Sequence, residues 1–311
     1  MEKKTADLGV HYEQIRTKPD PETPEAEEIR KSVGYWRAAW RRFKRNKMAV
    51  AGGCVVLVMM ILAALAPLVA PYGYDETHYE HTFEGSSLKF LFGTDELGRD
   101  MFSRVLYSLR NALIVAFGSQ AITLILGVLL GAIAGYRGGW IDTLIMRFVD
   151  IMYAFPTFLF NVILVTVLGR GLFTIFLAIG LVNWAGLARL VRGQILGLKQ
   201  VEYVEAARAI GAKDKHVISR YLLPNMLGPI IISFMMGIPA AMMTESGLSL
   251  IGMGLRPPMP SFGNLLNTGN GMVLGFPHLL IWPALVFALI LLGFNFLGDG
   301  LRDALNPRSE V

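Results

Sequence analysis

The sequence predicts an all-α polytopic membrane protein with six transmembrane helices. The first observation is composition: 53% of the 311 residues are hydrophobic and only 17% are charged, whereas soluble domains carry about 25% charged residues. The second is a set of apolar segments long enough to cross a hydrocarbon core of about 30 Å, which needs roughly 20 helical residues. The third is an uneven distribution of Lys and Arg between alternate loops. Since only helices and closed barrels span lipid, apolar runs of this length predict helices.

Six apolar segments have the required length. They are about residues 48–70, 111–136, 142–168, 172–190, 226–254 and 279–298. The first is followed directly by Pro71. Because the number of segments is even, both termini are expected on the same side of the membrane.

The basic residues decide which side that is. One set of loops and flanks carries Arg37, Arg41, Arg42, Lys44, Arg45, Lys47, Arg137, Arg147, Arg189, Arg192, Lys199, Arg208, Lys213, Lys215, Arg220, Arg302 and Arg308. The opposite set carries only Lys89, Arg99, Arg104, Arg110, Arg170 and Arg256. Since Lys and Arg concentrate in cytoplasmic loops, we expect both termini in the cytoplasm. This bias also accounts for the basic pI of about 9.3, which therefore does not indicate nucleic acid as a partner.

The remaining segments divide the chain into tails and a membrane domain. Residues 1–33 are polar, and MEKKTADLGVHYEQ has no apolar core of a cleavable signal. A basic cytoplasmic segment follows at 34–47. The membrane domain covers 48–307 and leaves a C-terminal tail at 308–311. Within it we expect three long loops: outer loops at 71–110 and 255–278, and a cytoplasmic loop at 191–225.

Small residues and prolines shape the predicted spans. The second span contains GVLLGAIAG, in which three glycines recur every four residues on one face and favour close helix packing. The residues with this spacing are Gly127, Gly131 and Gly135 in the second span, and Ser233, Gly237 and Ala241 in the fifth. Prolines are expected to interrupt three spans, by kinking them or freeing backbone carbonyls. They are Pro156, Pro239 and Pro283.

An outer segment, FGTDELGRDMFSRVLYSLRNAL, predicts an amphipathic helix at the outer interface. Thr94 or Asp95 would be its N-cap. Its apolar face would carry Leu97, Met101, Val105 and Leu109, and its polar face Arg99, Asp100, Ser103 and Arg104. The pattern fits both a lead-in lying on the membrane and a docking surface for an outside partner. The residue pattern by itself favours the lead-in.

Motifs for chemistry within the chain are absent from the sequence. It has no G-x-x-x-x-G-K-[ST], no H-E-x-x-H and no G-x-S-x-G. Its lone cysteine, Cys54, excludes an internal disulfide and a cysteine-based metal site. We therefore expect no catalytic residues and no metal site. If the protein moves a solute uphill, the energy comes from an ion gradient or from another subunit.

Two acidic residues lie within predicted spans. Glu245, in AAMMTESGLSL, is the main intramembrane acid and lies toward the outer side of the fifth span. Its pattern leaves two interpretations open: it lines a polar translocation path, or it forms a structural hydrogen bond to a neighbouring helix. Asp150 is expected to pair with Arg147 one turn earlier.

The cytoplasmic stretch EYVEAARAIGAKDKHVISRYLLP predicts a helix–turn–helix. Glu202 and Glu205 favour a helix N-terminus, the alanines are strong helix formers, and Gly211 can end the helix in the left-handed conformation. A second piece is expected at about 213–222, and Pro224 is expected to break the chain before the fifth span. The small Ala/Gly face is suited to entering a groove of another protein, although the same pattern fits a hairpin packed on its own bundle.

This stretch resembles the EAA signature of bacterial ABC-importer permeases, EAA-x3-G-x9-I-x-L-P. The matching residues are Glu205, Ala206, Ala207, Gly211, Leu223 and Pro224, and the chain departs from the pattern only at Tyr221, where the family has isoleucine. The segments RRFKRNKMAVAG, FGTDELGRDMFSR, ARLVRGQILGLK and FNFLGDGLRDALNP resemble one branch, the C-type permease subunit of oligopeptide and dipeptide importers. Nickel and glutathione permeases belong to the same branch. The resemblance covers about residues 35–307.

The resemblance implies a type I ABC-importer permease fold in a bacterial cell membrane. It implies a coupling helix that docks on a separate ATPase through Glu205, Ala206, Ala207, Gly211 and Pro224. The expected partners are membrane lipid, a homologous B-type permease, two ABC ATPases that hold ATP and Mg²⁺, and an extracytoplasmic peptide-binding protein. No cofactor is expected in this chain. The binding protein would dock near Asp95, Arg99 and Asp100, oligopeptide would pass a path near Glu245, and no nucleic acid is involved.

Other functions fit the residues as well. Dipeptide, nickel or glutathione import would use the same architecture. An ion-coupled carrier that works alone would need an intramembrane acid such as Glu245. A membrane scaffold without transport is a third alternative.

Overall fold

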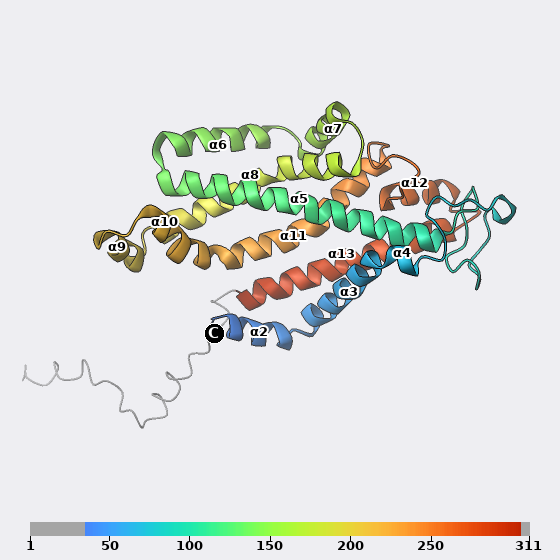
Figure 1. Cartoon of the computed structure of the whole chain (residues 1–311), viewed down its shortest axis with the longest axis horizontal. Coiled ribbons are helices and arrows are strands. Elements are labelled where there is room, and N and C mark those ends of the chain that lie inside the picture. The colour runs from blue at the N-terminus through green and yellow to red at the C-terminus, as the bar shows by residue number, and fades with distance from the viewer. Residues whose placement is uncertain (1–34, 306–311) are drawn as a thin grey trace, which may run out of the picture.

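The chain folds into an elongated bundle of helices (Figure 1). A computed structural model describes residues 35–305, and the predicted tails at 1–33 and 308–311 lie outside this range. Five helices are long and apolar enough to cross a membrane: α3 (Lys47–Ala64), α5 (Met101–Arg137), α8 (Leu172–Leu198), α11 (Leu223–Leu250) and α13 (His278–Leu305). A bent pair, α6 (Gly139–Ala154) and α7 (Thr157–Leu168), makes a sixth candidate span when its two helices are counted together. Within residues 35–305 no strand forms, which confirms the all-α prediction.

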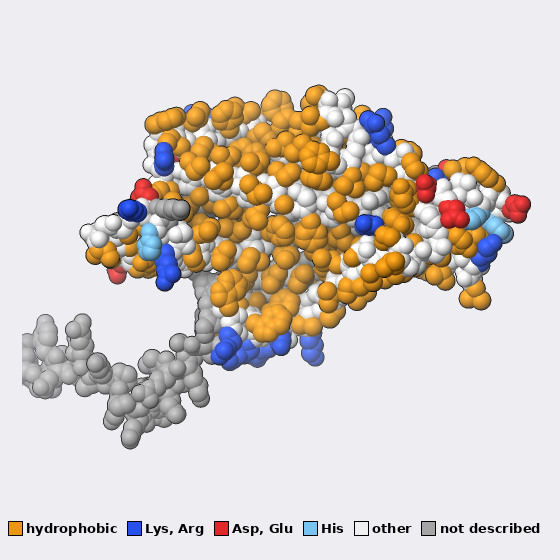
Figure 2. Space-filling view, in the orientation of Figure 1, with side chains coloured by type: hydrophobic (Ala, Val, Ile, Leu, Met, Phe, Trp, Pro, Cys, Tyr) orange, Lys and Arg blue, Asp and Glu red, His pale blue; other side chains and the backbone are white. Residues whose placement is uncertain are grey.

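Shorter elements lie at the two ends of the bundle. They are α2 (Tyr35–Arg45), α4 (Ala66–Val69), η1 (Tyr79–His81), α9 (Glu202–Ala209), α10 (Asp214–Val217), η2 (Ile218–Leu222) and α12 (Phe262–Met272). Helices α2, α9 and α10 lie at one end, and α12 with the outer loop (residues 71–100) lies at the other (Figure 1). Figure 2 shows a broad apolar band over the middle of the molecule, with charged side chains gathered mainly toward its ends.

The first span is shorter than predicted. Helix α3 begins after Asn46, whose side chain accepts a hydrogen bond from the Ala49 amide at 3.1 Å. The helix ends at Ala64 instead of Ala70, and a new turn, α4, carries Pro67 near its start. Proline fits the first turn of a helix because it needs no amide donor there.

Helices α5 and α8 share the most extensive contact of any helix pair in the described bundle. A Cβ added to Gly127 would lie 2.7 Å from Cβ of Leu187, and one added to Gly131 would lie 2.5 Å from the Ala188 carbonyl oxygen. Only glycine allows the two backbones to approach this closely. The predicted glycine face of the second span is therefore confirmed.

Proline acts differently in the three spans that contain it. At Pro156 the third span bends by 93° between α6 and α7, as predicted. Pro239 and Pro283 lie inside α11 and α13, which continue through them. These two spans are therefore not broken into separate helices, and a kink or freed carbonyls at Pro239 and Pro283 stay a prediction. Membrane helices tolerate proline because their surroundings can satisfy the freed carbonyls.

Ion pairs fasten α6 to α8. Arg192 forms a bidentate salt bridge with Asp142: its Nε donates to Oδ1 at 2.5 Å and its Nη2 donates to Oδ2 at 2.6 Å. Nearer the bend, Arg189 Nη2 lies 3.1 Å from Asp150 Oδ1. Asp150 thus pairs across helices and not with Arg147 as predicted, because antiparallel packing brings α8 alongside it.

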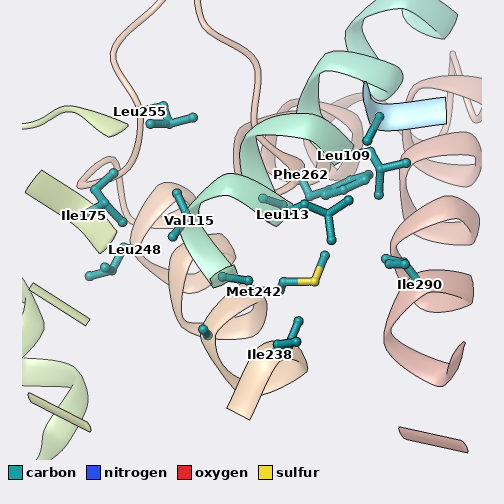
Figure 3. Close-up of a cluster of buried hydrophobic side chains, with 14 of the residues drawn as sticks. Leu109, Leu113, Val115, Ile175, Ile238, Met242, Leu248, Leu255, Phe262 and Ile290 are labelled. Atoms are coloured by element: carbon teal, nitrogen blue, oxygen red, sulfur yellow. The ribbon is translucent and has the colours of Figure 1, made fainter. Parts of the chain in front are cut away.

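The largest apolar core joins α5, α8, α11 and α13. Figure 3 shows part of this core, with side chains from α5 (Leu109, Val115), α11 (Met242), α12 (Phe262) and α13 (Ile290). A second cluster fills the end of the bundle below the α8–α11 loop (residues 199–222).

Candidate functional site

The α8–α11 loop forms a compact helical cap at the basic end of the bundle. Helix α9 begins at Glu202 and carries both glutamates in its first turn, which suits the positive end of the helix dipole. Gly211 then adopts φ +87°, a conformation that glycine reaches at little cost. The predicted helix and its glycine stop are confirmed.

Apolar side chains hold this loop against the bundle. Val204, Val217 and Leu222 are fully buried and pack in one cluster with Ile195 and Met226. Ala207 is only 3% exposed. One side of α9 therefore packs on its own bundle, and Ala207 positions the helix without forming its outer surface.

The other side of α9 is open. Glu205, Ala206 and Gly211 are exposed, and no atom lies within 4 Å of a Cβ added to Gly211. Ile210 is 86% exposed. The exposure of Ile210 was not predicted. The residue lies directly before Gly211, the glycine of the signature. The outer surface is thus small, partly apolar and sterically accessible.

Polar contacts tie the loop to the end of α5. The Tyr136 hydroxyl donates to Asp214 Oδ1 at 2.5 Å. Lys199 Nζ donates to the Tyr136 carbonyl at 2.8 Å and lies 5.5 Å from the centre of the Tyr136 ring. A cation among the last carbonyls of a helix is favoured by the helix dipole. Sequence reasoning missed this link because it joins residues far apart in the chain.

The start of the fifth span differs from the prediction. Residues Ile218–Leu222 form a π-helical turn, and Leu223 N donates to the Ile218 carbonyl. Pro224 lies in the first turn of α11 and does not break the chain. The π-helical turn runs directly into α11, so the loop passes into the span without a gap.

The outer segment also differs from the prediction. Helix α5 begins at Met101, where Asp100 caps it by accepting from the Ser103 amide at 2.8 Å. The expected interfacial helix from Asp95 does not form, and the residues after Met101 continue directly into the second span. Gly98 (φ +69°) turns the chain at this point.

Buried ion pairs hold that turn in place. Asp95 accepts from Arg99 Nε at 2.7 Å and from the Arg99 amide at 3.0 Å, and its Oδ2 lies 3.5 Å from Arg104 Nε. Asp95, Asp100 and Arg104 are all buried. The predicted solvent-facing polar side is therefore wrong, since Asp100, Ser103 and Arg104 point into the protein. The three predicted site residues Asp95, Arg99 and Asp100 lie together as a structural support.

Glu245 is buried in α11, where it is 1% exposed. Ser249 Oγ, four residues later in the same helix, donates to Glu245 Oε1 at 2.7 Å. Within the described residues Oε2 has no hydrogen-bond partner. The bond is intrahelical because i and i+4 lie on one helix face. Of the two interpretations of Glu245, the hydrogen bond to a neighbouring helix does not form among the described residues.

No group of three His, Cys, Asp or Glu residues that could hold a metal ion occurs within 35–305.

Comparison with known proteins places these features in context. Residues 127–311 match the family described as binding-protein-dependent transport system inner membrane component. Residues 34–86 match the N-terminal transmembrane domain of oligopeptide transport permease C.

Relatives align over nearly the whole chain. The dipeptide transport system permease protein of Alkalihalophilus pseudofirmus is 39% identical, covering 94% of this chain and 96% of the relative. The oligopeptide transport system permease protein of Haemophilus influenzae is 41% identical, with 88% and 89% coverage. The glutathione transport system permease protein of Pectobacterium atrosepticum is 40% identical, with 88% and 91% coverage.

A solved structure shares the fold. The crystal structure of an amino acid ABC transporter with histidines superposes with a TM-score of 0.50 at 14% identity. The match covers 65% of this chain and 94% of that chain.

Proposed function

Because the chain belongs to the family of inner membrane components of binding-protein-dependent transport systems, we propose that it is the permease subunit of an ATP-driven importer for oligopeptides. The chain is a multi-pass inner membrane protein and is not itself an enzyme. Named relatives transport dipeptides, oligopeptides and glutathione, so the substrate class that they share is a short peptide. The match of residues 34–86 favours oligopeptides among these.

One observation carries the proposal. The α8–α11 loop presents Ala206, Ile210 and Gly211 on an open surface while Val204 and Ala207 anchor its inner side. A rigid, small-faced helix between two membrane spans can enter a groove of a second protein without displacing its own core. We propose that this surface docks on an ABC ATPase and that Glu205 lies at its rim. Pro224 would contribute to docking from the first turn of α11, which directly follows the α8–α11 loop.

The proposed assembly supplies what this chain lacks. A homologous B-type permease would form the other half of the translocation path. Two ATPases would bind ATP and Mg²⁺, for which this chain has no P-loop motif. Closure of the ATPases on ATP would move the docked α9, and the contacts of Tyr136 and Lys199 would pass that movement to α5.

An extracytoplasmic peptide-binding protein would deliver substrate at the outer loop. The bonds of Asp95 to Arg99 and the cap that Asp100 forms on α5 give this loop a fixed shape. These residues would act by holding the docking surface. We also propose that Glu245 borders the path when the bundle opens, since a buried acid with an unpaired oxygen is costly to keep in a membrane span without a role.

The test is substitution at Gly211. Gly211→Glu adds a long charged side chain to the open surface, and we expect the inserted chain to lose ATPase binding and peptide uptake. Gly211→Asn is the matched control, because asparagine tolerates the left-handed conformation and stays small. Normal uptake by an inserted Gly211→Glu protein would refute the docking role.

Substrate and energy source are tested by reconstitution. Uptake of a labelled oligopeptide should require the B-type permease, the ATPases and the binding protein, and should exceed uptake of dipeptide, glutathione or nickel. Accumulation by this chain alone under an ion gradient would instead identify an ion-coupled carrier.

A further inference from the structure

Helix α2 is a short basic helix at the point where the chain enters the membrane. Its sequence is YWRAAWRRFKR, and residues 35–47 contain no acid. Arg37, Arg41, Lys44 and Arg45 recur at i, i+4, i+7 and i+8, so they share one face. All four are exposed. In the part of the chain that the structure describes, none of these four forms an ion pair.

The opposite side of α2 is fixed to the bundle. Ala39 is 5% exposed, and α2 packs along the end of α13. A Cβ added to Gly300 of α13 would lie 3.5 Å from Cε2 of Phe43. This packing directs the basic face away from the protein. Figure 2 shows Lys and Arg side chains along the edge where α2 lies, directly beside the apolar band.

An aromatic side chain lies next to the basic face. Trp40 is 57% exposed and stacks on Phe43 with ring centres 5.8 Å apart. Lys44 Nζ lies 5.1 Å from the centre of the Trp40 ring. Tryptophan is enriched where membrane meets water, because its ring is apolar and its N–H is polar. This combination is typical of helices that lie in the headgroup layer.

The depth of α2 in the membrane follows from its position next to α3. Only Asn46 separates it from α3, the first membrane span. The basic face therefore lies at the depth where the span leaves the hydrocarbon core, and phosphates of the adjoining leaflet lie at that depth. The basic residues of this end also indicate the cytoplasmic leaflet, whose surface is negative when anionic lipids are present.

We propose that α2 is a binding surface for anionic phospholipid headgroups of the cytoplasmic leaflet. Arg37, Arg41, Lys44 and Arg45 contact the phosphates, and Trp40 occupies the interface beside them. The surface lies on a different side of the bundle from α6 and α7 (Figure 1), so lipid binding there is separate from the contacts between α6 and α8.

The expected size of the effect follows from charge. One Lys or Arg close to an anionic surface changes the equilibrium between binding of anionic and of neutral lipid by about fivefold. Four of them should make α2 prefer phosphatidylglycerol over phosphatidylcholine by at least that factor. Raising NaCl from 0.1 M to 0.5 M should weaken the preference, because these side chains are exposed to salt screening.

The experiment uses the full chain reconstituted in liposomes of phosphatidylcholine and phosphatidylglycerol. One of the two lipids carries bromine on its acyl chains, and quenching of tryptophan fluorescence reports which lipid is adjacent. The signal of Trp40 is obtained as the difference between the wild type and Trp40→Phe. We expect phosphatidylglycerol to be enriched at Trp40 by about fivefold or more.

Variants then assign the preference to its residues. Replacement of all four cations by glutamine (R37Q, R41Q, K44Q and R45Q) should bring the ratio to about one. Lysine in place of the three arginines should keep the preference, since the charge is unchanged. The matched control is Arg137→Gln with Arg147→Gln, two cations of the same end but outside α2, which should leave the ratio at Trp40 unchanged.

Other occupants of the basic face give different results. If residues 1–33, with the acidic run PETPEAEE, cover the face, the lipid preference will appear only in a chain that lacks them. That result would overturn the proposal, as would a ratio near one in the wild type. If the glutamine variant does not insert, the salt titration of the wild type decides: a preference that 0.5 M NaCl leaves intact contradicts binding by these cations.

Discussion

The Tyr136 hydroxyl lies 2.5 Å from the Asp214 carboxylate oxygen, and this bond joins the end of α5 to the middle of the α8–α11 loop. The two residues are 78 positions apart. Lys199 strengthens the junction by donating to the carbonyl of Tyr136 itself. The loop therefore rests on two helices, α8 through the chain and α5 through these contacts.

Removing the hydroxyl should loosen that junction. For Tyr136→Phe we expect the α8–α11 loop to lose about 1 kcal/mol of local stability, because the bond is exposed and water can replace it in part. Hydrogen exchange of the amides of residues 212–222 measures this as faster exchange. In the proposed importer, peptide uptake per ATP hydrolysed should fall.

The control is Tyr79→Phe, an exposed tyrosine of the outer loop, which should change neither quantity. Asp214→Asn combined with Tyr136→Phe completes a double-mutant cycle. Additive effects of the two substitutions would show that the hydrogen bond contributes nothing to the junction.

Close packing of α5 on α8 predicts opposite effects at two glycines. Gly131→Ala places a Cβ 2.5 Å from a backbone oxygen of α8, which cannot move aside cheaply, and should cost about 2 kcal/mol. Gly193→Ala, in α8 with no atom within 4 Å, should stabilise by about 0.5–1 kcal/mol, because alanine favours a helix more than glycine does. Thermal unfolding in detergent checks both signs, and equal effects would contradict the packing.

The stability of the outer loop should depend on Asp95 and much less on the adjacent Glu96. Asp95 is 5% exposed at its side chain and faces two arginines, so Asp95→Asn leaves buried charges unpaired and should cost about 3 kcal/mol. Glu96 is 41% exposed and lies 4.0 Å from Arg99, so Glu96→Gln should cost less than about 1 kcal/mol. Proteolysis of the outer loop in membranes measures the difference. Similar cleavage of the two variants would argue against the buried network.

Substitutions at Glu245 and Ser249 can distinguish a role of Glu245 in stability from a role in transport. Glu245→Gln keeps the volume and an acceptor for Ser249, so we expect normal insertion and thermal stability. If the side chain borders the path, uptake should fall. Ser249→Ala removes only the hydrogen bond, should cost about 1 kcal/mol, and should retain uptake. Full uptake by Glu245→Gln would remove this residue from the path.

Local patterns predicted where the spans lie and where the first helix of the α8–α11 loop ends. The glycine spacing of the second span and the stop at Gly211 are visible as short local patterns, and the structure confirms both. The bend at Pro156 also followed from the sequence. Each of these features shows in a short stretch of sequence, although the contacts of the glycine face are made with α8.

Features that depend on tertiary contacts were missed or wrong. Asp150 was assigned a partner on its own helix, but α8 brings Arg189 within 3.1 Å. The outer segment had an amphipathic pattern, yet its polar side is buried because Asp95 and Arg104 pair inside the protein. A pattern of polar residues cannot distinguish a face that meets water from one that meets other charges. The exposed Ile210 lay within the recognised signature but between its defined positions.

Helix α5 begins at the capping carboxylate of Asp100 and ends just after Tyr136, and it contains no proline. Its 37 residues correspond to about 55 Å, well beyond a hydrocarbon core of about 30 Å. One uninterrupted rod therefore touches the outer loop at one tip and the α8–α11 loop at the other. Since one helix contacts both loops, we expect a displacement at one tip to be felt at the other, and a pair of distance probes at those two tips would then move in concert.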